Sequence, residues 1–379
     1  MQFMEADRNT CDKLLPGLRQ QLADIPLAEL ESAESPAIEM FRAHGGTNLM
    51  VPAAYGGLDA NALDAARVVR ALAAVAPSMT VATMMHHFSL GTLFAVAGIV
   101  GEDSGLEDLL LSRIVEENMI VASGFAEGRS GQGILTPTMT AEPVDGGFLI
   151  NGSKKPCSLS RSMDLLTASV AMPMADGEPG MGLLMLPADT PGVSIHPFWT
   201  TFALAGAESD EVRLTDVFVT PEHIIQPDPE FLEQMDQLTT VGLIWFQLTV
   251  CATYTGIASA LVEKVLERGR GSQTDRANLA VKIESAAALT EGLARRILDG
   301  EVDNDTLATA LVTRFAVQDA ISASVSQAVE LLGGMAFIGS QDVGYLAAAS
   351  HAIAFHPPSR ASMAGGLLDY YSGYRVTVA

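Results

Sequence analysis

The sequence of 379 residues is poor in cysteine. Its three cysteines, Cys11, Cys157 and Cys251, lie far apart, and none belongs to a CxxC motif. Such a set forms neither the disulfide framework of a small secreted protein nor a zinc site of the usual spacing. The first residues also show no basic segment followed by an apolar one, the pattern of a secretory signal. We therefore expect a cytoplasmic protein.

Positive charge is scarce as well. The chain has 22 Lys and Arg against 45 Asp and Glu, which gives a formal net charge of −23. A phosphate backbone or an anionic membrane surface would repel this charge, so we expect neither nucleic acid nor a membrane as a partner. A phosphorylated ligand would need a local basic pocket.

Charged residues make up only 18% of the chain and hydrophobic residues 48%. This balance excludes a disordered protein and implies large buried surfaces, within the core or between subunits. Two uncharged stretches, residues 71–101 and 237–262, are long enough to cross a membrane. Because Pro77, His86, His87 and several Ser and Thr interrupt the first, and Thr and Gln the second, we expect buried helices instead.

The hydrophobic period divides the chain into three zones. A helical period runs from residue 10 to about 119, where Asn61 can cap a helix. Short apolar runs follow, with a hairpin signal at Asp145-Gly146-Gly147, and the helical period returns after Pro229. This order predicts an α+β protein with an all-α domain (1–119), an antiparallel β-barrel or sandwich (120–229) and a helical bundle (230–379).

Five short motifs follow one another along the chain. They are V-P-A-A-Y-G-G at 51–57, G-F-A-E-G at 124–128, N-G-S-K-K at 151–155, E-V-R-L-T-D-V-F-V at 211–219 and Q-A-V-E-L-L-G-G at 327–334. With the order helix, β, helix, they resemble the acyl-CoA dehydrogenase superfamily. The resemblance spans nearly the whole chain. It implies bound FAD, a homodimer or homotetramer, and a substrate lying on the flavin between the β block and the last helical block.

The resemblance also assigns residues to the flavin ring. It implies that the backbone N–H groups of Phe125 and Ala126 face the pyrimidine, where they stabilise negative charge on the reduced ring. The Ser158 hydroxyl would contact the N5 region, although Ser158 can also be a plain turn serine. Gln132 and Ser359 are further cofactor-binding candidates.

A second group of residues is implied to bind the other end of FAD. Gln327, Gly333 and Gly334 would approach the adenine and pyrophosphate of FAD held by a neighbouring subunit, since glycine lets backbone come close to phosphate. Arg268 would pair with that pyrophosphate. The alternatives are a helix stop for Gly333-Gly334 and a solvated helix-end arginine for Arg268.

The residue that serves as catalytic base in the family is missing. Most members carry a glutamate shortly after the G-G segment, where this chain has Pro357. Other members carry the base on the long helix of the last block, where this chain has Phe246, next to Gln247. None of these residues is an acid, so ordinary α,β-dehydrogenation is not expected.

Other departures point the same way. Ala126 replaces a threonine, Pro156 an aromatic residue, and Ala348-Ala349 an Arg-Asp pair of the family. The superfamily contains a branch of flavin monooxygenases and oxidases, in which reduced flavin reacts with O₂ without a catalytic glutamate. A small apolar pocket containing Ala126 and Pro156 would protect a flavin–oxygen adduct from water.

The catalytic candidates are His356, Phe246 and Gln247. An unperturbed histidine titrates at about pH 6.5, so His356 is the preferred acid or base, held rigidly by the two prolines that follow it. The alternative is a structural histidine that caps this turn. His86 and His87 point about 100° apart on a helix, so we expect core or cleft-facing residues rather than a metal site.

The first hypothesis is therefore an FAD-dependent oxidoreductase of secondary metabolism, a monooxygenase or oxidase. It would act with O₂ on an acyl thioester, bound to CoA or a carrier, or on a related biosynthetic intermediate. The second is a dehydrogenase with a relocated base, Glu127 or His356, that passes electrons to an electron-transfer flavoprotein. The third is a non-catalytic paralogue. The nearest basic cluster for a CoA polyanion is Lys154, Lys155, Arg129 and Arg161, which can also serve hairpin solubility.

Overall fold

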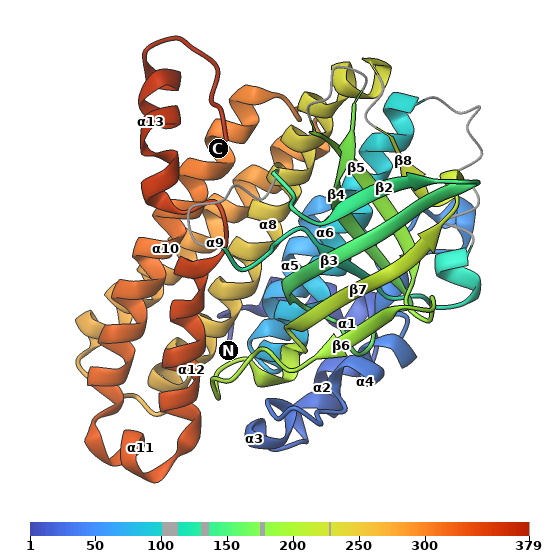
Figure 1. The fold of residues 1–379 in the computed structure, drawn as a ribbon. Helices are drawn as coiled ribbons and strands as arrows, with labels where there is room; N and C mark the ends of the chain where they lie inside the picture. Colours follow the sequence, from blue (N-terminus) through green and yellow to red (C-terminus); the bar gives the residue numbers. More distant parts are fainter. Residues whose placement is uncertain (101–112, 130–135, 175–178, 227–228, 379) are drawn as a thin grey trace.

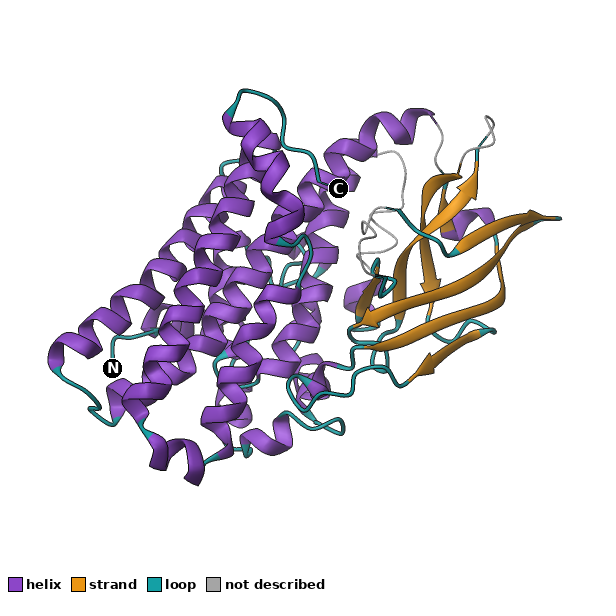
Figure 2. Ribbon diagram, turned by 60° about the vertical axis from the view of Figure 1, so that its left-hand side comes forward, coloured by secondary structure: helices purple, strands orange, loops and turns teal. Residues whose placement is uncertain are grey.

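The computed structural model describes residues 1–100, 113–129, 136–174, 179–226 and 229–378. Helices form one side of the molecule and a twisted sheet the other (Figures 1 and 2). The α+β fold expected from the sequence is confirmed, with a helical block before the sheet and another after it. The strands fall between residues 121 and 225; the predicted domain boundaries at 119 and 229 stay a prediction.

The N-terminal block is helical. Its helices are α1 (Glu5–Leu14), α2 (Leu18–Ala23), α3 (Leu27–Leu30), α4 (Ala37–Ala43), α5 (Ala62–Ala73) and α6 (Pro77–Val100). Asn61 caps α5 as predicted, because its side-chain oxygen accepts hydrogen bonds from the backbone of Leu63 and Asp64, each at 3.0 Å. The predicted break at Pro77 is also confirmed, since α5 ends before it and α6 begins with it.

The described strands form one eight-stranded sheet. They are β1 (Val121–Gly124), β2 (Thr140–Val144), β3 (Gly147–Cys157), β4 (Leu165–Pro173), β5 (Pro179–Pro187), β6 (Val193–His196), β7 (Asp210–Val219) and β8 (Ile224–Ile225). The order is β6-β7-β3-β2-β4-β5-β8, and β1 pairs in parallel with β4. The predicted hairpin joins β2 to β3. Gly146 in its turn has a φ of 80°, a conformation that favours glycine.

The C-terminal block is a bundle around one long helix. Its helices are α8 (Pro229–Glu267), α9 (Gln273–Leu298), α10 (Asn304–Leu332), α11 (Gly334–Gly339), α12 (Gln341–His351) and α13 (Arg360–Tyr371). Within the described chain, the segment Met235–Glu267 of α8 is long and apolar enough to cross a membrane, but 89% of its apolar window is buried inside the protein. It is therefore the central helix of the bundle, as the sequence predicts.

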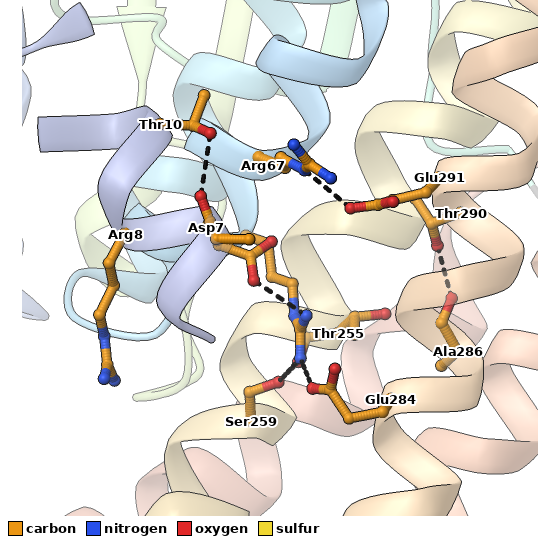
Figure 3. A network of polar contacts seen from close by, with 12 residues as sticks. Asp7, Arg8, Thr10, Arg67, Thr255, Ser259, Glu284, Ala286, Thr290 and Glu291 are labelled. Atoms are coloured by element: carbon orange, nitrogen blue, oxygen red, sulfur yellow. Dashed lines mark hydrogen bonds and ion pairs between the residues drawn. The ribbon is translucent and has the colours of Figure 1, made fainter. Parts of the chain in front are cut away.

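A buried arginine ties the two helical blocks together (Figure 3). Arg70 on α5 donates to Asp7 on α1 at 3.1 Å, to Ser259 on α8 at 3.2 Å and to Glu284 on α9 at 2.6 Å. Arg70, Asp7 and Ser259 are all buried. A buried charge is tolerated only when it is paired and hydrogen-bonded, so these contacts fix how the four helices sit against one another.

We predict that Arg70→Met lowers the free energy of unfolding by about 3 to 5 kcal/mol, because it leaves the buried Asp7 carboxylate without its cation. Arg295→Met is the matched control, since Arg295 forms an exposed pair with Glu291 at 3.0 Å, a type worth about 0.5 kcal/mol or less. Urea unfolding followed by circular dichroism measures both. Equal losses in the two variants would contradict the structural role of Arg70.

Candidate active site

Two neighbouring cavities lie between the sheet, α6, α8 and the segment that follows α12. The smaller holds about 200 Å³ and the larger about 510 Å³. Six residues line both cavities and so mark where they meet: Phe125, Ala126, Pro156, Ser158, His356 and Pro357. Four of these were predicted from the sequence as catalytic or cofactor-binding residues, and the structure brings them together.

The smaller cavity is walled by apolar side chains, most of them from α6, β5 and α8. They include Met85 and Phe88 on α6, Met181 and Leu183 on β5, and Leu238 and Phe246 on α8. The rings of Phe88 and Phe246 meet edge to face, with centroids 5.4 Å apart. Gly242 on α8 faces Thr92 closely, because an added Cβ would lie 3.3 Å from the Thr92 hydroxyl. Side chains of these types exclude water and leave few polar groups for a ligand.

The sheet supplies the opposite wall at the end of β1 and β3. Lys155 donates its backbone N–H to the Ala126 carbonyl at 2.8 Å, which holds the segment after β1 against β3. The Ser158 hydroxyl lies 2.9 Å from the Ser209 hydroxyl, and both residues line the larger cavity. Between Pro156 on β3 and Ser158 just after it, the Cys157 thiol points into the protein, where burial raises its pKa to about 12.

His356 sits where the two cavities meet. Its Nε2 lies 2.6 Å from the hydroxyl of Tyr254 on α8, and its ring meets Phe246 at 6.0 Å between centroids. Burial, together with the charge of Arg314 on α10, lowers the pKa of His356 to about 3. The imidazole is therefore neutral at physiological pH. This differs from the expectation of a proton exchange near neutrality, which assumed an unperturbed histidine.

Arg314 on α10 contacts the backbone of the segment that leads to His356. It is buried, and its guanidinium donates to the Ile353 carbonyl, just before His356, and to the Gln318 side chain at 3.1 Å. Among the described residues it has no carboxylate partner. A buried cation of this kind imposes a positive potential on the groups packed around it, and His356 is one of them.

Glu127, the other proposed base, is held by several donors. Lys154 lies 2.8 Å from its carboxylate, and Thr138 donates through both its backbone and its side chain. Burial opposes ionisation, but the hydrogen bonds from Lys154, Thr138 and Met139 outweigh it and lower the pKa of Glu127 to about 2. A carboxylate this strongly stabilised is a poor proton acceptor, so the relocated base is not favoured at Glu127.

Both positions that carry the base in acyl-CoA dehydrogenases reach the cavities. Pro357 lines both and Phe246 lines the smaller one. Among the described residues around the two cavities, Glu127 is the one acid. Gln247 lies elsewhere: it is fully buried, lines neither cavity, and its amide atoms have no described hydrogen-bond partner. The remaining catalytic candidates are therefore His356 and Phe246.

The residues predicted to bind the adenine and pyrophosphate of FAD line neither cavity of the same chain. Arg268 is exposed just beyond α8, and the Gln327 amide oxygen accepts a hydrogen bond from Lys282 at 2.7 Å. Gly333 has a φ of 81°, and open space surrounds Gly333 and Gly334. On α10, Gln327 lies thirteen residues beyond Arg314, the residue that contacts the segment before His356, which is about 20 Å along the helix. Their assignment to FAD of a neighbouring subunit stays a prediction.

The remaining predictions concern Ser359, Gln132 and His86. Ser359 caps α13, accepting the backbone N–H of Ser362 at 3.1 Å. Gln132 lies outside the described residues. The prediction for His86 is confirmed: it is buried and bonded to the Thr47 carbonyl at 2.8 Å and to the Val121 N–H at 3.1 Å.

Sequence reasoning missed Tyr254, Arg314 and Ser209. Tyr254 is 102 residues from His356 along the chain, and it stands in an apolar helix where a tyrosine gives no local signal. Arg314 lies in a mainly apolar helical run, between Thr313 and Phe315. Only the packing of α8 and α10 against the segment after α12 brings Tyr254 and Arg314 to His356.

Two family models match parts of the first 217 residues of this chain, and one relative matches nearly all of it. The model for the acyl-CoA dehydrogenase N-terminal domain matches residues 18–98, and that for the middle domain residues 122–217. Isobutylamine N-hydroxylase from Streptomyces viridifaciens is 50% identical over 373 residues, 98% of this chain and 99% of that protein. A dibenzothiophene monooxygenase from Rhodococcus qingshengii is 26% identical, over 61% of this chain and 55% of that protein.

Solved structures share the fold. FMN-bound TdsC from Paenibacillus sp. A11-2, a dibenzothiophene monooxygenase, superimposes with a TM-score of 0.84 at 16% identity and covers 99% of each chain. A nitrososynthase from Micromonospora carbonacea var. africana has a TM-score of 0.79 at 19% identity, covering 97% of this chain and 96% of that one. At these identities the likeness concerns the fold.

We predict that the His356 imidazole stays neutral down to about pH 3 in the wild type, and that Arg314→Met raises this pKa without restoring about 6.5, because burial persists. Nuclear magnetic resonance titration of the imidazole C–H signals measures the shift. The C–H signals of His223, whose side chain is 42% exposed, serve as the internal reference and should coincide in the two proteins. A wild-type His356 that titrates near 6.5 would refute this electrostatic description.

Proposed function

This chain belongs to the acyl-CoA dehydrogenase superfamily, as one of its flavin-dependent oxidoreductases, and we propose that it hydroxylates the nitrogen of a small aliphatic primary amine. The relative that shares half of its residues across the whole chain is an isobutylamine N-hydroxylase. Other relatives are flavin monooxygenases, which supports O₂ as the oxidant. The missing carboxylate base fits this branch of the superfamily.

The observation that carries the proposal is the smaller cavity. Its 200 Å³ equals about seven water molecules in the liquid. A branched amine with a few carbon atoms fits this volume, and the walls of Phe88, Leu238 and Phe246 match an alkyl group. An acyl thioester, the substrate expected from the sequence, would have to leave its CoA or carrier outside. It remains the alternative.

The larger cavity suits a flavin. Its volume of about 510 Å³ lies within the range of cofactor pockets. Pro156 and Ala126 offer apolar surface for a ring, and Ser158 offers a hydroxyl beside it. A bound reduced flavin would supply two electrons and two protons, so that one oxygen atom of O₂ enters an N–H bond of the amine and the other leaves as water.

The protein's own groups orient the amine and exclude water. When Tyr254 donates its hydroxyl proton to Nε2 of His356, the other ring nitrogen carries the imidazole proton, so His356 is a neutral hydrogen-bonding group. It lies between the two cavities, where an amine nitrogen would approach the flavin. The apolar wall around Phe246 keeps water from competing for that contact.

The same wall selects the protonation state of the amine. Burying an alkylammonium without a counter-ion is costly. Among the described residues that line the smaller cavity, none is an acid. The cavity is therefore suited to the free base, which is also the form with a lone pair available for oxygen transfer.

Exposed apolar side chains on the helical bundle support the expected homodimer or homotetramer. Met335 and Ile338 on α11 are 81% and 80% exposed, and Val281 on α9 is 65% exposed. Monomeric proteins seldom present large apolar surface of this kind. The oligomeric state remains a prediction.

We predict that the purified protein, given FMN or FAD and a flavin reductase, converts isobutylamine to its hydroxylamine and incorporates one atom from ¹⁸O₂, measured by mass spectrometry. A saturated acyl-CoA should give no product. Oxidation of the acyl-CoA without hydroxylamine would favour the thioester alternative, and the absence of both products would overturn the proposed function.

Phe246→Ala should enlarge the smaller cavity and raise kcat/KM for a longer amine relative to isobutylamine. Phe218→Ala is the control, since Phe218 on β7 is 49% exposed and lines neither cavity. Its preference should match the wild type. If Phe246→Ala kept the wild-type preference between the two amines, the substrate would not bind in this cavity.

We predict that kcat/KM for the amine rises about tenfold per pH unit between pH 7 and 9, because the free-base fraction of an amine with a pKa near 10.4 rises by that factor. His356 adds no titration in this range, since its pKa lies near 3. Steady-state rates at fixed ionic strength measure the profile. A flat or falling profile would show that the ammonium form binds.

A further inference from the structure

One tyrosine hydroxyl joins the three parts of the fold. Tyr345 on α12 belongs to the helical bundle, and its hydroxyl donates a hydrogen bond to Glu31, just after α3 in the N-terminal block. The same hydroxyl accepts the backbone N–H of Leu204 at 3.0 Å. Leu204 lies in the connection between β6 and β7 of the sheet. The Tyr345 hydroxyl therefore links the sheet to both helical blocks.

Glu31 fixes the direction of this hydroxyl. Its buried carboxylate also accepts the Ser78 backbone N–H at 3.0 Å and the Ser78 hydroxyl, in the first turn of α6. A carboxylate at the start of a helix is stabilised by the free N–H groups there. Burial, together with the charge of Glu31, raises the pKa of Tyr345. The hydroxyl therefore keeps its proton, donates it to Glu31 and leaves its lone pairs for the Leu204 N–H.

Leu204 has a backbone conformation that leucine rarely adopts. Its φ of 61° and ψ of 29° lie in the left-handed region, which is unfavourable for a bulky residue. Such a conformation persists only where the surrounding structure imposes it. The hydrogen bond from the Leu204 N–H to Tyr345 is one such restraint. The close packing of Gly206 is another, since an added Cβ there would lie 2.8 Å from the Ser32 carbonyl oxygen, just after α3.

The restrained segment forms part of the wall of the larger cavity. Leu204, Trp199 and Ser209 all line this cavity, and Leu204 is only 2% exposed. The Trp199 indole N–H donates to the Ala203 carbonyl at 2.8 Å, which attaches the indole ring to the residue before Leu204. The Ser209 hydroxyl lies 2.9 Å from that of Ser158 on the opposite side of the wall. The backbone conformation at Leu204 therefore determines where these side chains stand.

We propose that Tyr345 is a positioning residue for the larger cavity, whose hydroxyl holds Leu204 and Trp199 in place against the flavin that the cavity binds. The inference rests on the proposed function, which supplies the flavin. Tyr345 lines neither cavity, so it acts through Leu204 and not by touching a ligand. Without the hydroxyl, the buried Leu204 N–H loses its partner and the segment can leave its left-handed conformation. A flavin must then order the wall as it binds, which lowers its affinity.

Tyr345→Phe tests this inference, because it removes the hydroxyl and keeps the ring, which meets Phe202 at 6.2 Å between centroids. Tyr371→Phe is the matched control, since Tyr371 on α13 is 68% exposed and lines neither cavity. Amide hydrogen exchange of residues 198–209 is measured on the purified full-length proteins before flavin is added. Dissociation constants of FMN and FAD then come from quenching of flavin fluorescence. Circular dichroism checks that each variant is folded.

In the wild type we expect slow exchange of the Leu204 amide. Tyr345→Phe should speed exchange in residues 198–209 about fivefold or more, while exchange in α9 stays unchanged. It should also weaken the flavin that binds the wild type by about tenfold. At saturating flavin, kcat for isobutylamine should stay near the wild-type value, because Tyr345 touches no reacting group. Tyr371→Phe should match the wild type in every measurement.

Rapid exchange of the Leu204 amide in the wild type would overturn the inference, and so would unchanged exchange of residues 198–209 in Tyr345→Phe. Faster exchange with unchanged flavin affinity, or faster exchange in α9 as well, would equally contradict a positioning role. In those cases flavin still binds the wild type and the proposed function stands. Failure of both FMN and FAD to bind the wild type would instead overturn the proposed function, and this inference with it.

Discussion

The contacts of Arg70 fix the relative positions of the helices, and the shape of the cavities depends on those positions. Its guanidinium links α1, α8 and α9 to α5, and Gly256 brings α8 against α5, since an added Cβ would lie 2.3 Å from the Arg70 carbonyl oxygen. The wall residue Phe246 lies ten residues earlier on the same helix. A shift of α8 at Gly256 would therefore displace the wall of the smaller cavity.

The distribution of charge then decides which chemistry the site supports. The two family positions for a base are filled by Pro357 and Phe246, and burial, together with the charge of Arg314, keeps His356 uncharged. A site built in this way cannot readily remove a proton from carbon, yet it can hold a neutral amine. Positive charge gathers instead on the outer face of the sheet, around Arg129 and Arg213.

Local signals in the sequence predicted much of the fold. The helix cap at Asn61, the helix break at Pro77 and the hairpin turn at Gly146 each depend on residues only a few positions apart. These features could therefore be predicted from the sequence. The motif around Phe125 and Ala126 located one wall of the site. The partners of His356 could not be predicted in this way, because Tyr254 and Arg314 reach it only through the packing of separate helices. The lowered pKa of His356 followed from that packing and was missed with it.

The placement of the thiols has a consequence for the durability of the enzyme. Cys11, Cys157 and Cys251 are all buried, and burial raises the pKa of each to about 12. Peroxide attacks thiolates, and at neutral pH these residues present almost none. Cys157 stands between two residues of the site wall, yet it faces inward. Burial therefore protects the three thiols from hydrogen peroxide released in uncoupled turnovers with O₂.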